Sequence, residues 1–217
     1  IVGYAHLLSD SPAFSSLEQA EMAAVIKQQA EDVANIVEDL LTAAQADAGT
    51  LRVVTAPLDL ADELGRVLAG IGHRHAGCLE VDATPTPAVG DAMRVRQIIR
   101  NLVTNAIVHG GDHICVAAGR RAQQAHLTVT DDGPGLSPGE EERAFEPFQQ
   151  GGRDARGHNS VGLGLTISRQ LARLMGGDLT YSRESGLTVF RLVLPGRPVS
   201  TRSRVVRPRP HATAPVG

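Results

Sequence analysis

Residues 129–136 read Val-Thr-Asp-Asp-Gly-Pro-Gly-Leu, a β-type run that ends in two acidic residues and a Gly-Pro-Gly turn. The glycines allow a close approach of other backbone or of a ligand. Asp131, at the end of the run, offers a carboxylate that can accept a hydrogen bond from the amino group of adenine. A plain β-turn capped by Asp131 explains the same letters. The neighbouring segments must therefore decide between a turn and a binding loop.

Upstream, two asparagines lie inside residues 93–108, a stretch with helical periodicity. Asn101 and Asn105 are four residues apart, which places both amides on one helix face about one turn apart. An amide oxygen suits a hard cation, and Mg²⁺ that is bound with a nucleotide needs few protein ligands. Taken alone, such a pair is more often a surface or capping feature.

Downstream, residues 160–165 read Ser-Val-Gly-Leu-Gly-Leu and lead directly into a predicted helix over residues 165–175. The backbone amides of this glycine loop can face a phosphate at the positive end of the helix. A short glycine loop before a helix is common, so this segment is also weak evidence by itself.

A possible lid lies between the two glycine segments. Residues 143–148 read Arg-Ala-Phe-Glu-Pro-Phe, and residues 149–159 are polar and rich in glycine. This pattern is typical of a mobile lid that is hinged on aromatic anchors, here Phe145 and Phe148. A loop held by two core phenylalanines is the simpler alternative, and both descriptions can hold together.

Residues 51–195 alternate short β-type runs with helical stretches, which predicts an α+β fold arranged as a two-layer sandwich. The predicted strands cover residues 51–55, 114–118, 127–130, 179–181 and 189–194. The predicted helices cover residues 60–70, 93–108 and 165–175.

Residues 1–50 have a different pattern. Apolar residues recur at three- and four-residue steps over residues 17–48, which predicts a long amphipathic helix that ends at Gly49. A shorter apolar segment, residues 1–8, precedes a Ser-Asp-Ser-Pro loop, so the two segments predict a helical hairpin. Two helices bury little alone, and we expect the apolar stripe to pack against a second copy in a four-helix bundle. The alternative is a stripe that packs on its own domain.

The order of these segments is more specific than any one of them. The asparagine pair, Asp-x-Gly-x-Gly, Phe-x-x-Phe, Gly-x-Gly-Leu and a final Gly-Leu-Thr-Val-Phe at residues 186–190 resemble the N, G1, F, G2 and G3 boxes of sensor histidine kinases. The resemblance covers residues 1 to about 195. It implies the Bergerat-type ATP-binding sandwich, also found in gyrase, heat-shock chaperone ATPases and MutL-type mismatch-repair proteins, with ATP and Mg²⁺ as cofactors.

The resemblance also implies roles for the matching residues. Asn105 would coordinate Mg²⁺, and Asp131 would hold the adenine amino group with Thr188 close by. The other residues that would shape the nucleotide pocket or anchor its lid are Gly133, Gly135, Phe145, Phe148, Gly162, Leu163, Gly164 and Leu165.

Two positions bear on the chemistry. Gyrase-type ATPases carry a general-base glutamate at the position of Asn101, and an amide cannot take a proton from water, so the γ-phosphoryl group should be kept for another acceptor. Many histidine kinases carry Lys or Arg three residues after the Mg²⁺ asparagine, where this chain has Val108 followed by His109. We count Asn101 and His109 among the nucleotide-binding residues. The catalytic candidates are Asn101 and the lid arginines Arg153 and Arg156.

The acceptor histidine of this family opens a His-Glu-Leu-Arg-Thr-Pro-like box. The residues that usually follow that box resemble residues 1–5, so we expect the box immediately before Ile1. None of the eight histidines has that context, because even His6, on the right helix, is followed by two leucines. The implied partners are a second copy, bound through the hairpin, and the receiver domain of a response regulator.

Composition narrows the remaining choices. No apolar run is long enough to span a membrane, which predicts a cytoplasmic domain whose parent protein would be anchored, if at all, elsewhere. The net charge is −3, although residues 196–217 hold five arginines and no acid. We expect that tail to be disordered and the acidic remainder not to bind nucleic acid. Cys78 and Cys115 lack a metal-ligand spacing and are predicted to be reduced thiols.

Two other function classes stay open. A degenerate ATP-binding fold that dimerises and docks partners without turnover would explain Val108 and the missing acceptor. A serine kinase of the anti-sigma type shares the fold but lacks the hairpin. Nucleotide binding that depends on Mg²⁺ would argue against the first.

Overall fold

A mixed sheet dominates the computed structural model, which describes residues 16–71, 78–137, 139–141, 143–147 and 162–197. Within these residues the main sheet has five strands in the order β2-β4-β5-β7-β6. Only β2 and β4 are parallel, and the other neighbouring strands are antiparallel. The strands are β2 Leu79–Ala83, β4 Ile114–Arg121, β5 Gln124–Asp131, β6 Asp178–Glu184 and β7 Leu187–Pro195.

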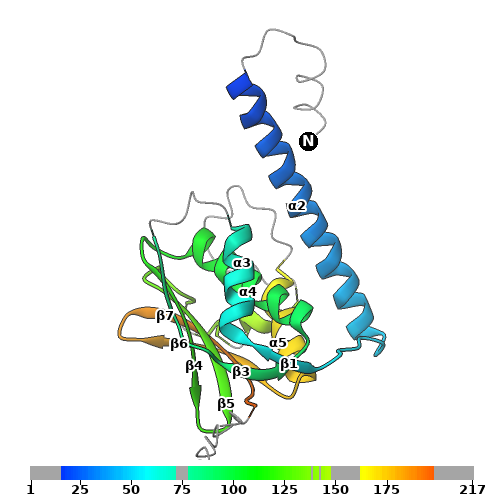
Figure 1. Ribbon diagram of the computed structural model, residues 1–217, viewed down its shortest axis with the longest axis vertical. Helices are drawn as coiled ribbons and strands as arrows, with labels where there is room; N and C mark the ends of the chain where they lie inside the picture. The colour runs from blue at the N-terminus through cyan, green and yellow to red at the C-terminus, as the bar shows by residue number, and fades with distance from the viewer. Residues whose placement is uncertain (1–15, 72–77, 138, 142, 148–161, 198–217) are drawn as a thin grey trace, which may run out of the picture.

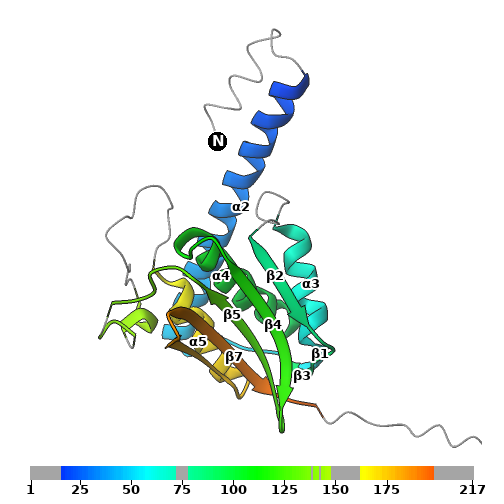
Figure 2. The same ribbon diagram turned by 90° about the vertical axis from the view of Figure 1, so that its left-hand side faces the viewer.

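Three helices cover one face of this sheet (Figures 1 and 2). They are α3 Leu60–Gly70, α4 Ala92–His109 and α5 Gly164–Leu174. Along β4 and β5 every second side chain is buried, because alternate residues of a strand point to opposite faces and one face meets the helices. The predicted two-layer α+β sandwich is therefore confirmed.

The core lies between α4 and the sheet. The side chains of Ile98, Ile99 and Leu102 on α4 are completely buried, as are those of Leu127 and Val129 on β5. Burying such apolar side chains stabilises a fold by about 1.5–3 kcal/mol each. This contact therefore fixes the position of α4 and of the asparagines that it carries.

Aspartate caps set where the first two of these helices begin. The Asp59 carboxylate accepts a hydrogen bond from the Ala61 N–H at 2.9 Å, and Asp91 accepts from Met93 at 3.0 Å and Arg94 at 3.3 Å. Such caps satisfy backbone donors that the first helical turn leaves free. The predicted bounds of α3 and α4 agree with the structure to within a residue.

The predicted strand over residues 51–55 is wrong. Leu51 is buried in the core, but its N–H donates to Gln45 O at 3.0 Å, and the Val54 N–H donates to Asp91 Oδ2 at 3.0 Å. The backbone is therefore satisfied by the end of a helix and by a cap, and not by a sheet partner. The strand β1, Ala56–Asp59, follows this segment and pairs antiparallel with β3, Pro87–Gly90.

The long helix α2, Ser16–Asp47, agrees with the predicted helix, and Gly49 follows it with a φ of +66°. Its upper part projects away from the sandwich (Figure 1). Its last turns pack on the domain, where Thr42 is buried and Ala46 contacts the core. Residues 1–8 lie outside the described residues, so the hairpin stays a prediction. No helix in the described part of the chain is long and apolar enough to cross a membrane.

Candidate functional site

The candidate site forms where β5 ends, beside the C-terminal end of α4 and the start of α5. Strand register places Asp131 of β5 opposite Thr188 of β7, and Thr188 opposite Arg183 of β6. These three residues therefore form a row across neighbouring strands at one end of the sheet. Two of them, Asp131 and Thr188, were predicted from sequence to lie together.

Asp131 is the buried acid of this row, with 5% of its surface exposed. Burial raises the pKa of the Asp131 carboxyl, whereas the Gly133 N–H, the Thr188 hydroxyl and the Arg183 guanidinium favour its charged form. The Gly133 N–H donates to Asp131 Oδ1 at 3.0 Å. The second carboxyl oxygen can thus accept a hydrogen bond from a ligand.

The glycine loop after Asp131 needs its glycines. A Cβ atom at Gly133 would lie 2.7 Å from the Cα atom of Gly110, just after α4. Gly135 has a φ of +68°, and a Cβ atom there would lie 2.6 Å from Arg183 Nη1. Only glycine lets the loop pack this closely on α4 and β6.

Two residues of β6 hold the same loop, and sequence reasoning did not single them out. The Arg183 guanidinium donates to the Gly133 carbonyl oxygen at 2.7 Å, and the Leu136 N–H donates to the Tyr181 hydroxyl at 3.0 Å. Counting alternate residues along β6 from the buried Leu179 finds both on the helix-covered face. This alternation along β6 is the sequence signal that could have identified Tyr181 and Arg183.

Asn101, the first residue of the asparagine pair, faces the start of α5. Asn101 Nδ2 donates to Ser168 Oγ at 2.9 Å, and Ser168 is buried. A Cβ atom at Gly164 would lie 2.4 Å from Asn101 Oδ1, so this glycine lets the first turn of α5 approach α4. Asn105 lies one turn further along α4 and is half-buried. The structure therefore brings Asn101 together with Gly164 of the second glycine loop.

The described end of the second glycine loop is shaped for a close helix start. Gly162 has a φ of +70°, and Leu163, which precedes α5, is buried. Leu163, the N-cap residue of α5, makes no side-chain capping hydrogen bond to the amides of the first turn. Leu165 is half-buried and packs against the core. This end of α5 is suited to a phosphate.

Phe145 is half-buried and contacts Arg169 of α5. Its ring packs against the core, and the Arg169 guanidinium carbon lies 4.6 Å from the ring centroid. Arg169 Nε in turn donates to Asp178 Oδ1 at 3.1 Å. Of the other lid predictions, Phe148, Arg153 and Arg156 lie outside the described residues.

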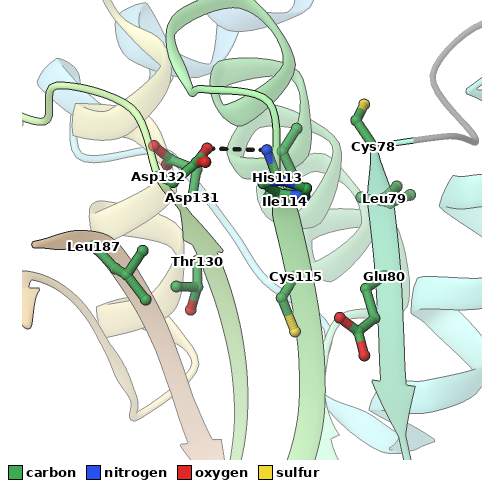
Figure 3. Close-up of a pocket in the computed structure, with 10 residues that line it drawn as sticks. All are labelled: Cys78, Leu79, Glu80, His113, Ile114, Cys115, Thr130, Asp131, Asp132 and Leu187. Carbon is green, nitrogen blue, oxygen red and sulfur yellow. Dashed lines mark hydrogen bonds between the residues drawn. The ribbon is translucent and has the colours of Figure 1, made fainter. Parts of the chain in front are cut away.

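A hollow of about 300 Å³ opens beside Asp131 and is lined by residues at the ends of β2, β4 and β5 (Figure 3). Asp132 Oδ1 accepts a hydrogen bond there from the His113 N–H at 2.9 Å. Of the predicted site residues that the structure describes, only Asp131 lines this hollow, so it is not the predicted nucleotide pocket. Cys78 and Cys115 also line it and point away from one another, and neither forms a disulfide.

The metal-ligating capacity of the described residues is small. No three His, Cys, Asp or Glu side chains in these residues converge as a metal site. Asn105 offers one half-buried amide, and His109 lies exposed at the end of α4. This donor set fits a Mg²⁺ ion that keeps waters and takes its other ligands from a bound phosphate.

Comparison with known proteins gives this geometry a context. The sequence profile of the family described as "Histidine kinase-, DNA gyrase B-, and HSP90-like ATPase" matches residues 90–198. Sensor protein KdpD of Mycobacterium tuberculosis is 31% identical over 198 residues, 87% of this chain and 23% of KdpD. The histidine-protein kinase/phosphatase MprB of Mycobacterium avium is 32% identical over 199 residues, 87% of this chain and 37% of MprB. This chain thus spans well under half of these relatives.

Solved structures agree with the sequence matches. The mycobacterial sensor histidine kinase MprB superimposes with a TM-score of 0.59 at 30% identity, over 66% of this chain and 99% of that one. Full-length ShkA, described as a complex with AMPPNP, gives a TM-score of 0.65 at 25% identity, over 90% of this chain and 42% of that one.

Proposed function

This chain belongs to the histidine kinase-, DNA gyrase B- and HSP90-like ATPase family as the catalytic ATP-binding domain of a sensor histidine kinase, and from that premise we propose that it binds Mg·ATP and delivers the γ-phosphoryl group to a histidine. The observation that carries the proposal is Asp131. It is a buried carboxylate at the end of β5, held by the N–H of Gly133 in the glycine loop. The AMPPNP complex of ShkA supports a ligand shaped like ATP.

We propose that different residues of the site contact the adenine, the phosphates and Mg²⁺. Asp131 would accept a hydrogen bond from the adenine amino group, with the Thr188 hydroxyl beside it. The uncapped first turn of α5 would meet the phosphates with its backbone amides. Asn105 would supply an amide oxygen to Mg²⁺. When bound, Mg²⁺ neutralises negative charge on the phosphates.

Asn101 supports transfer rather than hydrolysis. Its amide has no basic lone pair with which to take a proton from water. Its Nδ2 is also committed to Ser168, which holds α4 against α5 close to the predicted phosphate site. We therefore infer that Asn101 positions the two helices and that the phosphoryl group is kept for an imidazole acceptor. Arg153 and Arg156 remain candidates for stabilising the transferred charge.

The acceptor and partners follow from the same premise. We propose that the histidine lies on a dimerisation helix and that the phosphoryl group passes on to an aspartate of a response-regulator receiver domain. The C-terminal half of α2 supports a homodimer, because Val33, Val37 and Leu41 are 52%, 58% and 58% exposed along one stripe. Such a stripe is suited to a four-helix bundle with a second copy.

Calorimetric titration of residues 1–217 with ATP, with and without Mg²⁺, tests the proposal. Asp131→Asn should weaken binding by about 1.5–3 kcal/mol, because it replaces a charged acceptor with an amide. Asn105→Ala should remove most of the Mg²⁺ dependence. Unchanged affinity in a folded Asp131→Asn variant would contradict the assignment of the adenine site. No binding by the unmodified chain would favour the interaction-module alternative.

A further inference from the structure

Arg183 joins the two parts of the site that surround Asp131. Its Nη1 donates to the Gly133 carbonyl oxygen at 2.7 Å and to Thr188 Oγ1 at 2.7 Å. One side chain of β6 therefore holds both the glycine loop and the β7 hydroxyl that lies opposite Asp131. The predicted roles of the nucleotide-box residues do not include this arginine.

The direction of these hydrogen bonds is fixed by the chemistry of arginine. A guanidinium can only donate, so Thr188 Oγ1 must accept from it. The hydroxyl proton of Thr188 is then free to be donated to the Asp131 carboxylate, with which Thr188 forms a side-chain hydrogen bond. The chain runs from Arg183 through Thr188 to Asp131, and each donor favours a carboxylate that accepts.

The charge of Arg183 acts in the same sense. Burial raises the pKa of the Asp131 carboxyl, and the Arg183 guanidinium opposes that rise. Asp132, the next residue, adds to the rise. Two histidines lie on other sides of Asp131. His113 lines the same hollow as Asp131, and His109 is the last residue of α4, which packs on the glycine loop. Arg183 is the cation that acts on Asp131 from β6.

We propose that Arg183 is a positioning residue for base selection, holding Thr188 and Gly133 so that Asp131 remains a hydrogen-bond acceptor for a 6-aminopurine and rejects a 6-oxopurine. This inference rests on the proposed ATP-binding function. A protonated Asp131 could donate to a 6-oxo group, whereas an ionised one repels it. The selectivity for the base would thus depend on a side chain that need not contact the nucleotide.

Binding of ATP and of inosine triphosphate to Arg183→Met, measured by calorimetry between pH 5 and pH 8, tests the proposal. Methionine keeps an unbranched stem and removes the charge and both donors. We expect ATP to bind about three- to tenfold more weakly at neutral pH, and its preference over inosine triphosphate to narrow by a similar factor. Without the guanidinium the carboxyl protonates more readily, so ATP affinity should be lost at a higher pH than in the unmodified chain.

Two further variants separate charge from structure. Arg191→Met removes an arginine of similar size from β7, on the opposite face of the sheet, and should change neither the preference nor the pH profile. Arg183→Lys keeps the charge and should restore the pH profile more fully than the affinity. Comparing the two nucleotides at each pH cancels the titration of their phosphates, which they share.

The outcomes distinguish the two proposals. If the unmodified chain binds no ATP, the proposed function fails and the role of Arg183 fails with it. If the chain binds ATP but Arg183→Met, folded by circular dichroism, keeps the same preference and pH profile, only the role of Arg183 is overturned. A loss of affinity with an unchanged preference would also overturn base selection.

Discussion

Two sides of α4 are built from opposite kinds of contact. Toward the sheet, the helix presents side chains that are apolar and fully buried: Val95, Ile98, Ile99, Leu102 and Val103. Toward α2, it presents Arg94, Gln97 and Arg100, which meet Glu38, Asp39 and Thr42. The first side belongs to the core, and the second is a polar joint, as we call this set of six residues.

The apolar side of α4 stabilises the fold, whereas the polar side lets α2 move relative to the site. Apolar burial is strong and insensitive to pH, so α4 and its asparagines stay with the sheet. Partly exposed ion pairs contribute about 0–1 kcal/mol each. The joint can therefore open while the nucleotide site stays folded, and apart from the contact of Ala46 with the core, little then holds α2 to the domain. Three variants and two controls, described below, test this difference.

The largest effect is expected on the sheet side of α4. Leu102→Ala should lower the free energy of unfolding by about 2–5 kcal/mol, because it removes a fully buried side chain and leaves a cavity. Urea unfolding followed by circular dichroism measures the change. Thr104→Ala, an exposed position on the same helix, is the control and should stay within about 0.5 kcal/mol. Equal effects of the two variants would contradict the described core.

Most of the elements that form this core could be predicted from the sequence. The bounds of α3 and α4 were predicted from helical periodicity, and in the structure Asp59 and Asp91 cap these stretches. The strands β2 and β3 could not be predicted. β2 alternates with the acids Glu80 and Asp82, and it is a strand only because β4, far along the chain, pairs with it. β3 is short, runs from a proline to a glycine, and depends on β1 in the same way.

The candidate site divides similarly. The glycines and acids of the nucleotide boxes have an order that sequence reasoning can recognise. The contacts of Arg183 and Ser168 have no such signal, because cross-strand register places the arginine and helix packing places the serine. At residues 51–55 the sequence misleads in the opposite direction. Their apolar residues are typical of a strand, but in the structure the segment is not a strand and Leu51 is buried against the core. The roles of Asn105, Phe148 and the lid arginines stay predictions.

The second effect concerns the joint. The Arg94 side chain, 13% exposed, has its Nη1 2.9 Å from Gln97 Oε1, 3.4 Å from Thr42 Oγ1 and 3.5 Å from Glu38 Oε1. Arg94→Met should weaken the joint by about 1 kcal/mol without unfolding the domain. Hydrogen exchange should then be about fivefold faster in the last turns of α2 and unchanged in β5 and β7.

Arg100→Gln is the matched control for Arg94. Its guanidinium is 40% exposed and lies 3.6 Å from Glu38 Oε2, so solvent already screens the pair. The exchange of α2 should change less than in Arg94→Met. Equal protection of α2 in Arg94→Met and the unmodified chain would show that the joint does not hold the helix.

The smallest effect is a dependence of the joint on pH. Burial raises the pKa of the Asp39 carboxyl, and neighbouring Glu38 raises it further, while the bond from Gln97 Nε2 at 3.1 Å and the charge of Arg100 lower it. Because the pKa is higher in the docked state than in the unfolded chain, the docked state binds the proton more tightly. The contribution of Asp39 is therefore most favourable below its ordinary pKa and is lost as pH rises through the raised value. Asp39→Asn mimics the protonated acid at every pH. At pH 7.5 its α2 protection factors should therefore equal or exceed those of the unmodified chain. The difference, about 1 kcal/mol or less, should shrink toward pH 4.5. A difference that grows on acidification would mean that Asp39 docks as a charged group, and the polar joint would then tighten rather than loosen toward neutral pH.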